Sequence, residues 1–393
     1  MASKIIYHNR RLNYLPTFLL LFVGLFFIYL LTSAGNTPYD YFTRLAQSFL
    51  EGKYWISDNP PWLNELVPAS NGNYYIVYPA MPAILSIPFV SIFGKSFPQQ
   101  ILAHLLGAGI SVFLARLSFL YIKDIKIALW VGLLSGLGSI IWFLSSTGSS
   151  WYLGQLTAAF FLTAALLESF SKKRALLVGI FLGAAYLSRL HTILSLPFFL
   201  YIFRENYKEN FTKILFGVAP FIGFNFAYNF LRFGVIWDKG YLLIPGLFNE
   251  PWYQKGLFHP SYIPRHLKII FASFPIQTSK PPFIKPSWSG LAIWITTPAF
   301  VYAFKAKFEK TIVKLAWLTI ILIALVIFMH GTTGFIQFGY RFAVDFYPFL
   351  FLLIIFSFTK SKLKWHHFVL LLISIIVNFW GVMSINYFGW VSF

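Results

Sequence analysis

Long apolar runs alternate with short basic clusters along this chain of 393 residues, and the alternation predicts a helical membrane protein. About 20 apolar residues in a helix cover the ~30 Å hydrocarbon core of a bilayer. Basic clusters flank the runs, as at 172–174, 305–314 and 360–364. Short loops rich in Lys and Arg stay in the cytoplasm. The clusters therefore orient the chain with its N-terminus inside.

The pattern predicts an all-α polytopic fold with about eleven transmembrane helices and the C-terminus outside. The expected spans are 15–34, 98–121, 127–146, 153–170, 175–188, 192–203, 212–231, 289–304, 311–329, 343–359 and 367–385. Two long segments, 35–97 and 232–288, then lie on the extracytoplasmic side, and connections of that length are usually functional. The apolar, proline-broken stretch 79–95 is expected to be an interfacial helix. We expect residues 1–393 to form one transmembrane domain without a separate soluble domain.

The composition supports a membrane protein and argues against soluble, nucleic-acid-binding and thiol-dependent proteins. The chain is 58% hydrophobic and only 11% charged, against about 25% charged in soluble domains. Most of the net charge of +19 falls in the predicted cytoplasmic clusters, which indicates topology and contact with anionic lipids rather than nucleic acid. Without cysteine, disulfides and thiol catalysis are excluded. No His/Asp/Glu grouping has the spacing of metal ligands, so we expect no metal or other cofactor.

Asp40 is the candidate catalytic residue. It follows the first span by six residues, which brings it near the outer headgroups, and an amphipathic pattern follows it up to Gly52. A carboxylate at the start of such a helix can take a proton from a hydroxyl group. The ordinary alternative is that Asp40 caps this helix.

Basic residues of the outer segments are candidate ligands for a lipid phosphate. They are Arg265, Lys280, Lys285 and Arg341. Arg and Lys hold phosphate through charge-assisted hydrogen bonds. The alternatives are anchoring to lipid headgroups and, for Arg341, an ion pair with Asp345 one helical turn away.

Aromatic residues of the outer segments, including Trp55 and Trp288, could stack on sugar rings or form the interfacial belt of a membrane protein. Together with Arg44 and Tyr78 they are candidates for substrate contact. Arg189 and His191 are expected at an outer turn with no special role. No acidic residue falls in the middle of a predicted span, which argues against a cation-coupled transporter.

Four segments, in order, resemble the GT-C superfamily of membrane glycosyltransferases, particularly the bacterial relatives of protein O-mannosyltransferases and of the lipid A aminoarabinose transferase (families 39 and 83). They are PYDYFTRLAQSFLEGKYW, NYYIVYPAMPAILSIPF, GIFLGAAYLSRLHTILSLPF and GYRFAVDFYPFLFLL. The resemblance covers about 36–355. Two positions depart from the pattern of these relatives: Tyr41 follows Asp40 where Glu is frequent, and Tyr78-Pro79-Ala80 stands in place of Lys-Pro-Pro.

The resemblance implies an inverting glycosyltransferase that moves a sugar from a polyprenyl-phosphate donor to an acceptor hydroxyl on the extracytoplasmic face. It implies that Asp40 is the general base and that fixed basic side chains stabilise the departing phosphate. The expected partners are the lipid-linked donor, an envelope glycan or protein acceptor and membrane lipids, in a bacterial cell membrane. Two alternatives remain open: an O-antigen ligase or polymerase, and a flippase of lipids or sugars.

Overall fold

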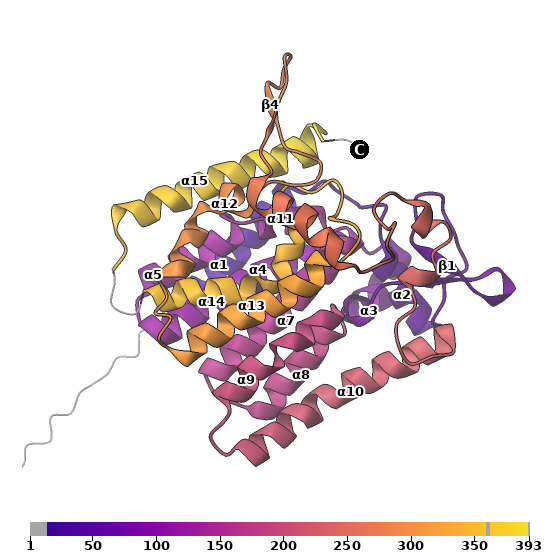
Figure 1. The fold of residues 1–393 in the computed structure, drawn as a ribbon, viewed down its shortest axis with the longest axis horizontal. Coiled ribbons are helices and arrows are strands. Elements are labelled where there is room, and N and C mark those ends of the chain that lie inside the picture. Colours follow the sequence, from indigo (N-terminus) through magenta and orange to yellow (C-terminus); the bar gives the residue numbers. More distant parts are fainter. Residues whose placement is uncertain (1–13, 359–361, 392–393) are drawn as a thin grey trace, which may run out of the picture.

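The structure is a computed structural model that describes residues 14–358 and 362–391. Within these residues it consists of helices and two small antiparallel sheets of two strands each (Figure 1). Most predicted spans coincide with a single helix. These helices are α1 (Leu15–Leu31), α4 (Gln99–Ile122), α7 (Ser150–Phe170), α8 (Ala175–Tyr186), α10 (Tyr207–Phe233), α13 (Thr311–Phe328), α14 (Tyr347–Ser357) and α15 (Trp365–Val382).

Three predicted spans are built from shorter pieces. The segment 127–146 forms α5 (Ile125–Gly136) and α6 (Ile141–Thr147), which are bent by 54°. The segment 192–203 is a 3₁₀ turn followed by α9 (Leu196–Ile202), and 289–304 is α12 (Ile293–Thr296) followed by a 3₁₀ helix over Pro298–Lys305.

Five helices in the described chain are long and apolar enough to cross a bilayer, or six if the bent pair counts as one span. The helical, polytopic class of the fold is thus confirmed, whereas the count of eleven remains a prediction.

Close packing of α8 against α10 depends on two glycines, one on each helix. A Cβ on Gly179 of α8 would lie 2.3 Å from the carbonyl oxygen of Ile214, and one on Gly217 of α10 would lie 2.5 Å from that of Leu176. Small residues let helix backbones approach in this way inside membranes. Helix α14 lies at the centre, where residues such as Phe349 and Leu352 are fully buried.

The two long outer segments carry their own elements. The first contains α2 (Tyr41–Leu50), β1 (Leu66–Pro68), β2 (Tyr74–Ile76) and α3 (Met81–Phe93), the last at the position of the predicted interfacial helix. The second contains α11 (Ile263–Ala272), β3 (Ile276–Gln277) and β4 (Ile284–Lys285). Strands β3 and β4 pair with Ile276 opposite Lys285. Their hairpin projects from the body beside α15 (Figure 1).

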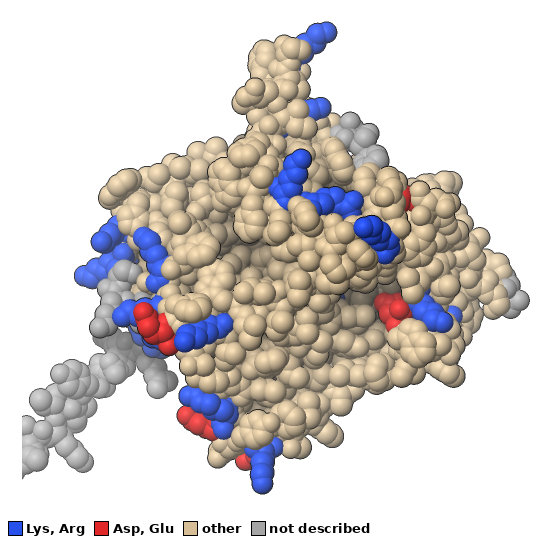
Figure 2. All heavy atoms as spheres, in the orientation of Figure 1, with Lys and Arg blue, Asp and Glu red and all other residues tan. Residues whose placement is uncertain are grey.

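On the face seen in Figure 2, charged side chains gather at two separated edges. One group lies at the left and lower left, near α5, α9 and the start of α10. The other lies near α11, the hairpin and α2, and the surface between the groups is almost free of charge. An uncharged belt between two polar edges is the arrangement expected of a protein that crosses a bilayer.

Candidate active site

Glu65 is an acidic residue held inside the outer part of the fold by aromatic side chains. Trp151 Nε1 donates a hydrogen bond of 2.8 Å to Glu65 Oε2, and the Tyr241 hydroxyl donates one of 3.4 Å to the same oxygen. The hydroxyl of Tyr41 accepts a bond of 3.1 Å from the backbone N–H of Glu65. Burial raises the pKa of the Glu65 carboxyl to about 7, although the hydrogen bond from Trp151 and the positive charge of Arg341 act in the opposite direction.

Arg341 is a buried guanidinium, 7% exposed, without a carboxylate partner among the described residues. Its Nη1 donates to Gln155 Oε1 at 3.3 Å, and its Nε has no hydrogen-bond partner. The rings of Tyr152 and Phe342 lie 5.6 and 4.7 Å from its guanidinium carbon. A buried guanidinium normally needs an anion. Arg341 is therefore suited to bind one.

Helix α7 brings Glu65 and Arg341 together. Trp151, which holds Glu65, and Gln155, which contacts Arg341, lie four residues apart on this helix. Residues at this spacing share one face, with Cβ atoms about 5–6 Å apart. The carboxyl and the guanidinium are therefore presented one turn apart, from segments that are far from each other in sequence.

Gly334 packs directly against Arg341. Its φ is +89°, and a Cβ there would lie 2.9 Å from Arg341 Nε and 2.7 Å from Gln337 Oε1. Gly334→Ala is expected to displace the Arg341 side chain, because neither the backbone angle nor the space suits a side chain. We expect it to weaken binding of a lipid phosphate about tenfold, as for one impaired charge-assisted hydrogen bond. Titration with a polyprenyl phosphate measures this, with Gly256→Ala as control: Gly256 also has a positive φ but has open space around it. Equal affinities of the two variants would contradict the prediction.

Asp345 does not pair with Arg341, contrary to the alternative raised by the sequence. Its Oδ2 instead accepts hydrogen bonds from Arg189 Nε at 3.1 Å and from His191 Nε2 at 2.8 Å. The Asp345 side chain is fully buried, and those of Arg189 and His191 are 29% and 14% exposed. The sequence did not predict this contact, which joins the turn at Arg189 and His191 to the segment that carries Asp345.

Asp345→Ala is expected to destabilise the fold. It leaves Arg189 partly buried without its counter-charge, and breaking a buried pair costs about 3 kcal/mol. A thermal unfolding experiment in detergent should show a clearly lowered midpoint. Glu209→Ala, which removes an exposed pair with Lys213, should leave the midpoint almost unchanged. Equal midpoints for the two variants would show that the network does not stabilise the fold.

Asp40 and Arg44 lie at the start of α2, on the other side of the same aromatic cluster. Asp40 occupies the N-cap position but makes no capping bond; its Oδ1 accepts one of 2.7 Å from Arg44 Nε. Arg44 also pairs with Asp58. The rings of Tyr39 and Trp151 lie 4.6 Å apart, so the backbone of Asp40 runs close to the residue that holds Glu65.

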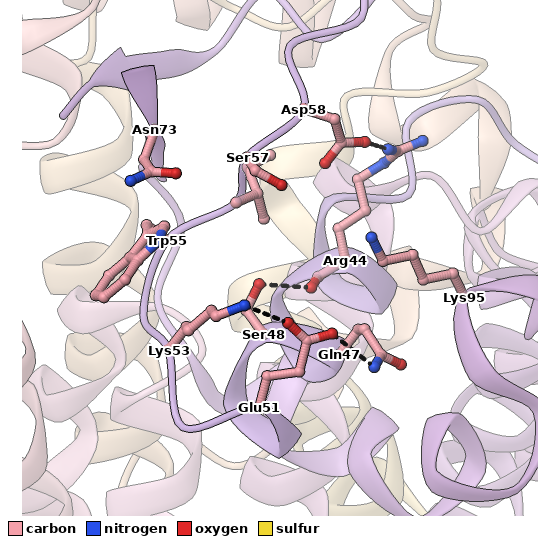
Figure 3. Close-up of a pocket in the computed structure, with 11 residues that line it drawn as sticks. Arg44, Gln47, Ser48, Glu51, Lys53, Trp55, Ser57, Asp58, Asn73 and Lys95 are labelled. Carbon is pink, nitrogen blue, oxygen red and sulfur yellow. Dashed lines mark hydrogen bonds and ion pairs between the residues drawn. The ribbon is translucent and has the colours of Figure 1, made fainter. Parts of the chain in front are cut away.

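A pocket of about 80 Å³ opens beside this ion-pair group (Figure 3). Trp55 and Asn73 lie on one side of it and Arg44, Asp58 and Lys95 on the other. Trp55 and Arg44 therefore line the same pocket from opposite sides, whereas Arg341 does not line it.

The other predicted residues are spread over the outer segments. Arg265 braces the second outer segment by donating to the carbonyl oxygens of Gly331 and Trp252. Lys280 is exposed in the turn of the projecting hairpin, and Lys285 lies on β4. The structure thus gives Arg265 a structural partner and does not bring the two lysines into the Glu65–Arg341 cluster.

The two aromatic candidates differ. Trp288 stacks on Phe335, with ring centroids 5.7 Å apart, and packs near Trp252. Tyr78 is 6% exposed, its ring lies 5.1 Å from that of Tyr41, and its hydroxyl has no hydrogen-bond partner. Tyr78 belongs to the aromatic surroundings of Glu65 because its ring also lies 6.3 Å from that of Tyr241.

Glu65 was not among the residues selected from the sequence. One signal could have identified it: Glu65 stands between Leu63 and Val67 at two-residue spacing, and both are buried. In an extended segment this spacing puts three side chains on one face. An acid on an inward face is unusual and marks a candidate functional residue.

Comparisons with known proteins found resemblance in structure alone. No family model and no curated protein matches the chain. Among solved structures, ArnT from Cupriavidus metallidurans bound to undecaprenyl phosphate aligns with a TM-score of 0.55 and 12% identity, over 93% of this chain and 63% of that one. The apo oligosaccharyltransferase from Archaeoglobus fulgidus aligns with a TM-score of 0.51 and 14% identity, over 95% of this chain and 56% of that one.

This chain thus spans less than two thirds of the length of either structure. Both are membrane proteins with the GT-C fold. The resemblance of the sequence motifs to this superfamily is confirmed at the level of the fold: the chain shares the GT-C fold of these two structures.

Proposed function

We propose that this protein is an inverting glycosyltransferase that takes a sugar from a polyprenyl-phosphate donor and moves it to an acceptor hydroxyl. The acceptor oxygen attacks the anomeric carbon, the bond from that carbon to the lipid phosphate breaks, and a carboxylate takes the proton of the hydroxyl. Negative charge grows on the departing phosphate, so a fixed cation beside it lowers the barrier.

The observation that carries this proposal is the buried Arg341 guanidinium, which no carboxylate among the described residues neutralises. It lies one turn of α7 from a carboxyl group that can exchange a proton near neutral pH. The GT-C fold and the undecaprenyl phosphate bound to the ArnT structure support a lipid phosphate as the anion. A phosphate and an arginine match in geometry as well as charge.

Two carboxylates are candidates for the base. Asp40, proposed from the sequence, is held by Arg44 at 2.7 Å. Glu65 is held by the neutral donors Trp151 and Tyr241, and Trp151 lies one turn of α7 from Gln155, which contacts Arg341. Bases work best when their pKa is close to the working pH. We therefore propose Glu65 as the base and a supporting role for the Asp40–Arg44 pair.

We place the reaction on the extracytoplasmic side of a bacterial cell membrane. The support is charge sidedness: exposed clusters at 172–174, 208–213 and 305–310 mark one edge of the molecule as cytoplasmic. Glu65 belongs to the predicted outer segment 35–97, whose helices α2 and α3 lie at the right in Figure 1, away from the left edge of the molecule.

The proposal is tested with purified protein in vesicles that contain a panel of undecaprenyl-phosphate sugars, labelled in the sugar, together with an extract of envelope glycans and proteins. Transfer should release undecaprenyl phosphate and move label to a water-soluble or envelope product, and only with one donor. A flippase would move the labelled lipid between leaflets and leave the sugar on it. Transfer from undecaprenyl diphosphate-linked oligosaccharides alone would indicate a ligase or polymerase.

A further inference from the structure

The outer face of α11 carries apolar side chains and one lysine, although it points away from the protein. Its buried residues are His266, Ile269 and Ile270. The opposite face carries Pro264, Leu267, Lys268 and Phe271, all exposed. Their spacing of three and four residues forms a continuous stripe along the helix. Such a stripe is costly in water, so a non-aqueous neighbour is expected.

The β3–β4 hairpin continues this surface. Its exposed large hydrophobic side chains are Phe274, Ile276, Phe283 and Ile284. In Figure 1 the hairpin extends past the body beside α15. In Figure 2 the charged side chains visible on this projection are all basic. We call residues 263–285, which comprise α11, both strands and their connections, the arm.

The charge of the arm has one sign only. From Pro251 to Phe308 the chain contains no Asp or Glu, whereas Lys268, Lys280 and Lys285 lie in the arm. Apolar side chains mixed with lysines are typical of segments that lie in the headgroup region of anionic membranes. Basic residues close to an anionic lipid surface are attracted to it.

The buried side of α11 fixes the arm to the candidate active site. His266 Nδ1 is 2.6 Å from the Tyr340 hydroxyl, and His266 Nε2 is 2.9 Å from the carbonyl oxygen of His330. Tyr340 directly precedes Arg341 in the chain. The arm is therefore not an isolated loop, since its base is attached to the segment that carries the candidate phosphate ligand.

We propose that the arm docks on the outer leaflet of the membrane, with its apolar side chains among the acyl chains and its lysines on anionic lipid phosphates. The occupant is an anionic lipid surface rather than a second protein. The charge of one sign and the exposed aromatic residues beside an uncharged belt support this choice. This inference does not depend on the sugar transfer proposed above.

The absence of native cysteine allows a direct test. Phe283→Cys places a single thiol on the hairpin, and an environment-sensitive fluorophore on it reports contact with lipid. The labelled protein is reconstituted in vesicles of phosphatidylcholine and phosphatidylglycerol that carry a nitroxide on the acyl chains. Ser70→Cys, in an exposed turn of the first outer segment, is the matched control. Quenching should be several-fold stronger at position 283 than at position 70.

A second comparison tests the role of charge. Lys280→Glu/Lys285→Glu in the Phe283→Cys background should lose most of that quenching in vesicles with phosphatidylglycerol. Both side chains lie on the projecting hairpin, and unchanged elution and unfolding midpoints would show that the fold is intact. Equal quenching at positions 283 and 70 would overturn the proposal. Strong quenching that is the same in purely zwitterionic vesicles, or unaffected by the charge reversal, would overturn the recognition of anionic lipid.

Discussion

Arg341→Gln is expected to weaken binding of undecaprenyl phosphate by about 30-fold, the equivalent of one charge-assisted hydrogen bond of about 2 kcal/mol. Arg341 Nε is buried without a partner, and its only side-chain hydrogen bond in the described chain is the 3.3 Å contact with Gln155. A phosphate would satisfy the free donors and neutralise the charge. The measurement is an equilibrium titration of the purified protein in detergent with the lipid phosphate.

Two further variants separate binding from folding. Arg341→Lys keeps the charge but lacks the planar fork of donors, so its affinity should fall between those of wild type and Arg341→Gln. Arg204→Gln removes a guanidinium that is stacked on Tyr201 in the connection between α9 and α10, and it should bind like wild type. If Arg341→Gln keeps both its unfolding midpoint and its affinity, the phosphate does not bind at Arg341.

Local features of the sequence were sufficient to predict most of the helices. Runs such as 98–121 and 311–329 became α4 and α13 with ends shifted by at most two residues, because the length of an apolar run is a local property that the bilayer selects. The prediction was less accurate at 289–304. There Pro298 follows the short helix α12, and the chain continues as a 3₁₀ helix.

The side-chain pairings could not be predicted in the same way. The ion pair expected between Arg341 and Asp345 followed from their spacing of four, but the segment 341–346 is a 3₁₀ helix, in which residues four apart do not share a face. Asp345 could then meet Arg189 and His191, which are more than 150 positions away. Such contacts depend on how α8 and α14 are placed against each other.

Dependence on contacts between distant segments also explains why the four predicted phosphate ligands differ in the structure. All four were selected because they lie in outer segments. That placement predicts the side of the membrane but not the direction in which each side chain points. Only Arg341 reaches the cluster with Glu65; Arg265 is bonded to backbone carbonyls, and Lys280 lies in a hairpin turn that projects from the body. Glu65, by contrast, was recognisable only through its buried neighbours Leu63 and Val67.

Glu65→Gln is expected to reduce the rate of sugar transfer by about 10²- to 10⁴-fold, the contribution typical of a general base. The amide keeps the size of the side chain, and its carbonyl oxygen can still accept the hydrogen bond from Trp151, so the fold and the affinity for lipid phosphate should change little. The measurement is the single-turnover rate with the donor identified in the transfer experiment.

The pH dependence of that rate distinguishes a base from a structural residue. Because burial raises the pKa of Glu65 to about 7, the carboxyl is mostly protonated below that pH and cannot accept a proton. Wild-type activity should therefore rise as the pH increases through 7 and level off above about pH 8. The donor is a phosphodiester, which does not titrate in this range. Glu65→Gln should lack this rise in its residual activity.

Asp40→Asn supplies the decisive comparison between the two carboxylates. If Glu65 is the base, Asp40→Asn should keep the rise near pH 7 and lose activity mainly through the altered position of Arg44, its ion-pair partner at 2.7 Å. If Asp40 is the base, Asp40→Asn should lose the rate of transfer while Glu65→Gln remains active.

Trp151 contacts Glu65 directly and the neighbourhood of Asp40 through the ring of Tyr39. A Trp151→Phe variant should affect the enzyme mainly through Glu65, because it removes the hydrogen bond to that carboxyl. A downward shift of the wild-type pH midpoint in Trp151→Phe would contradict this, because loss of that hydrogen bond should raise the pKa of Glu65 further.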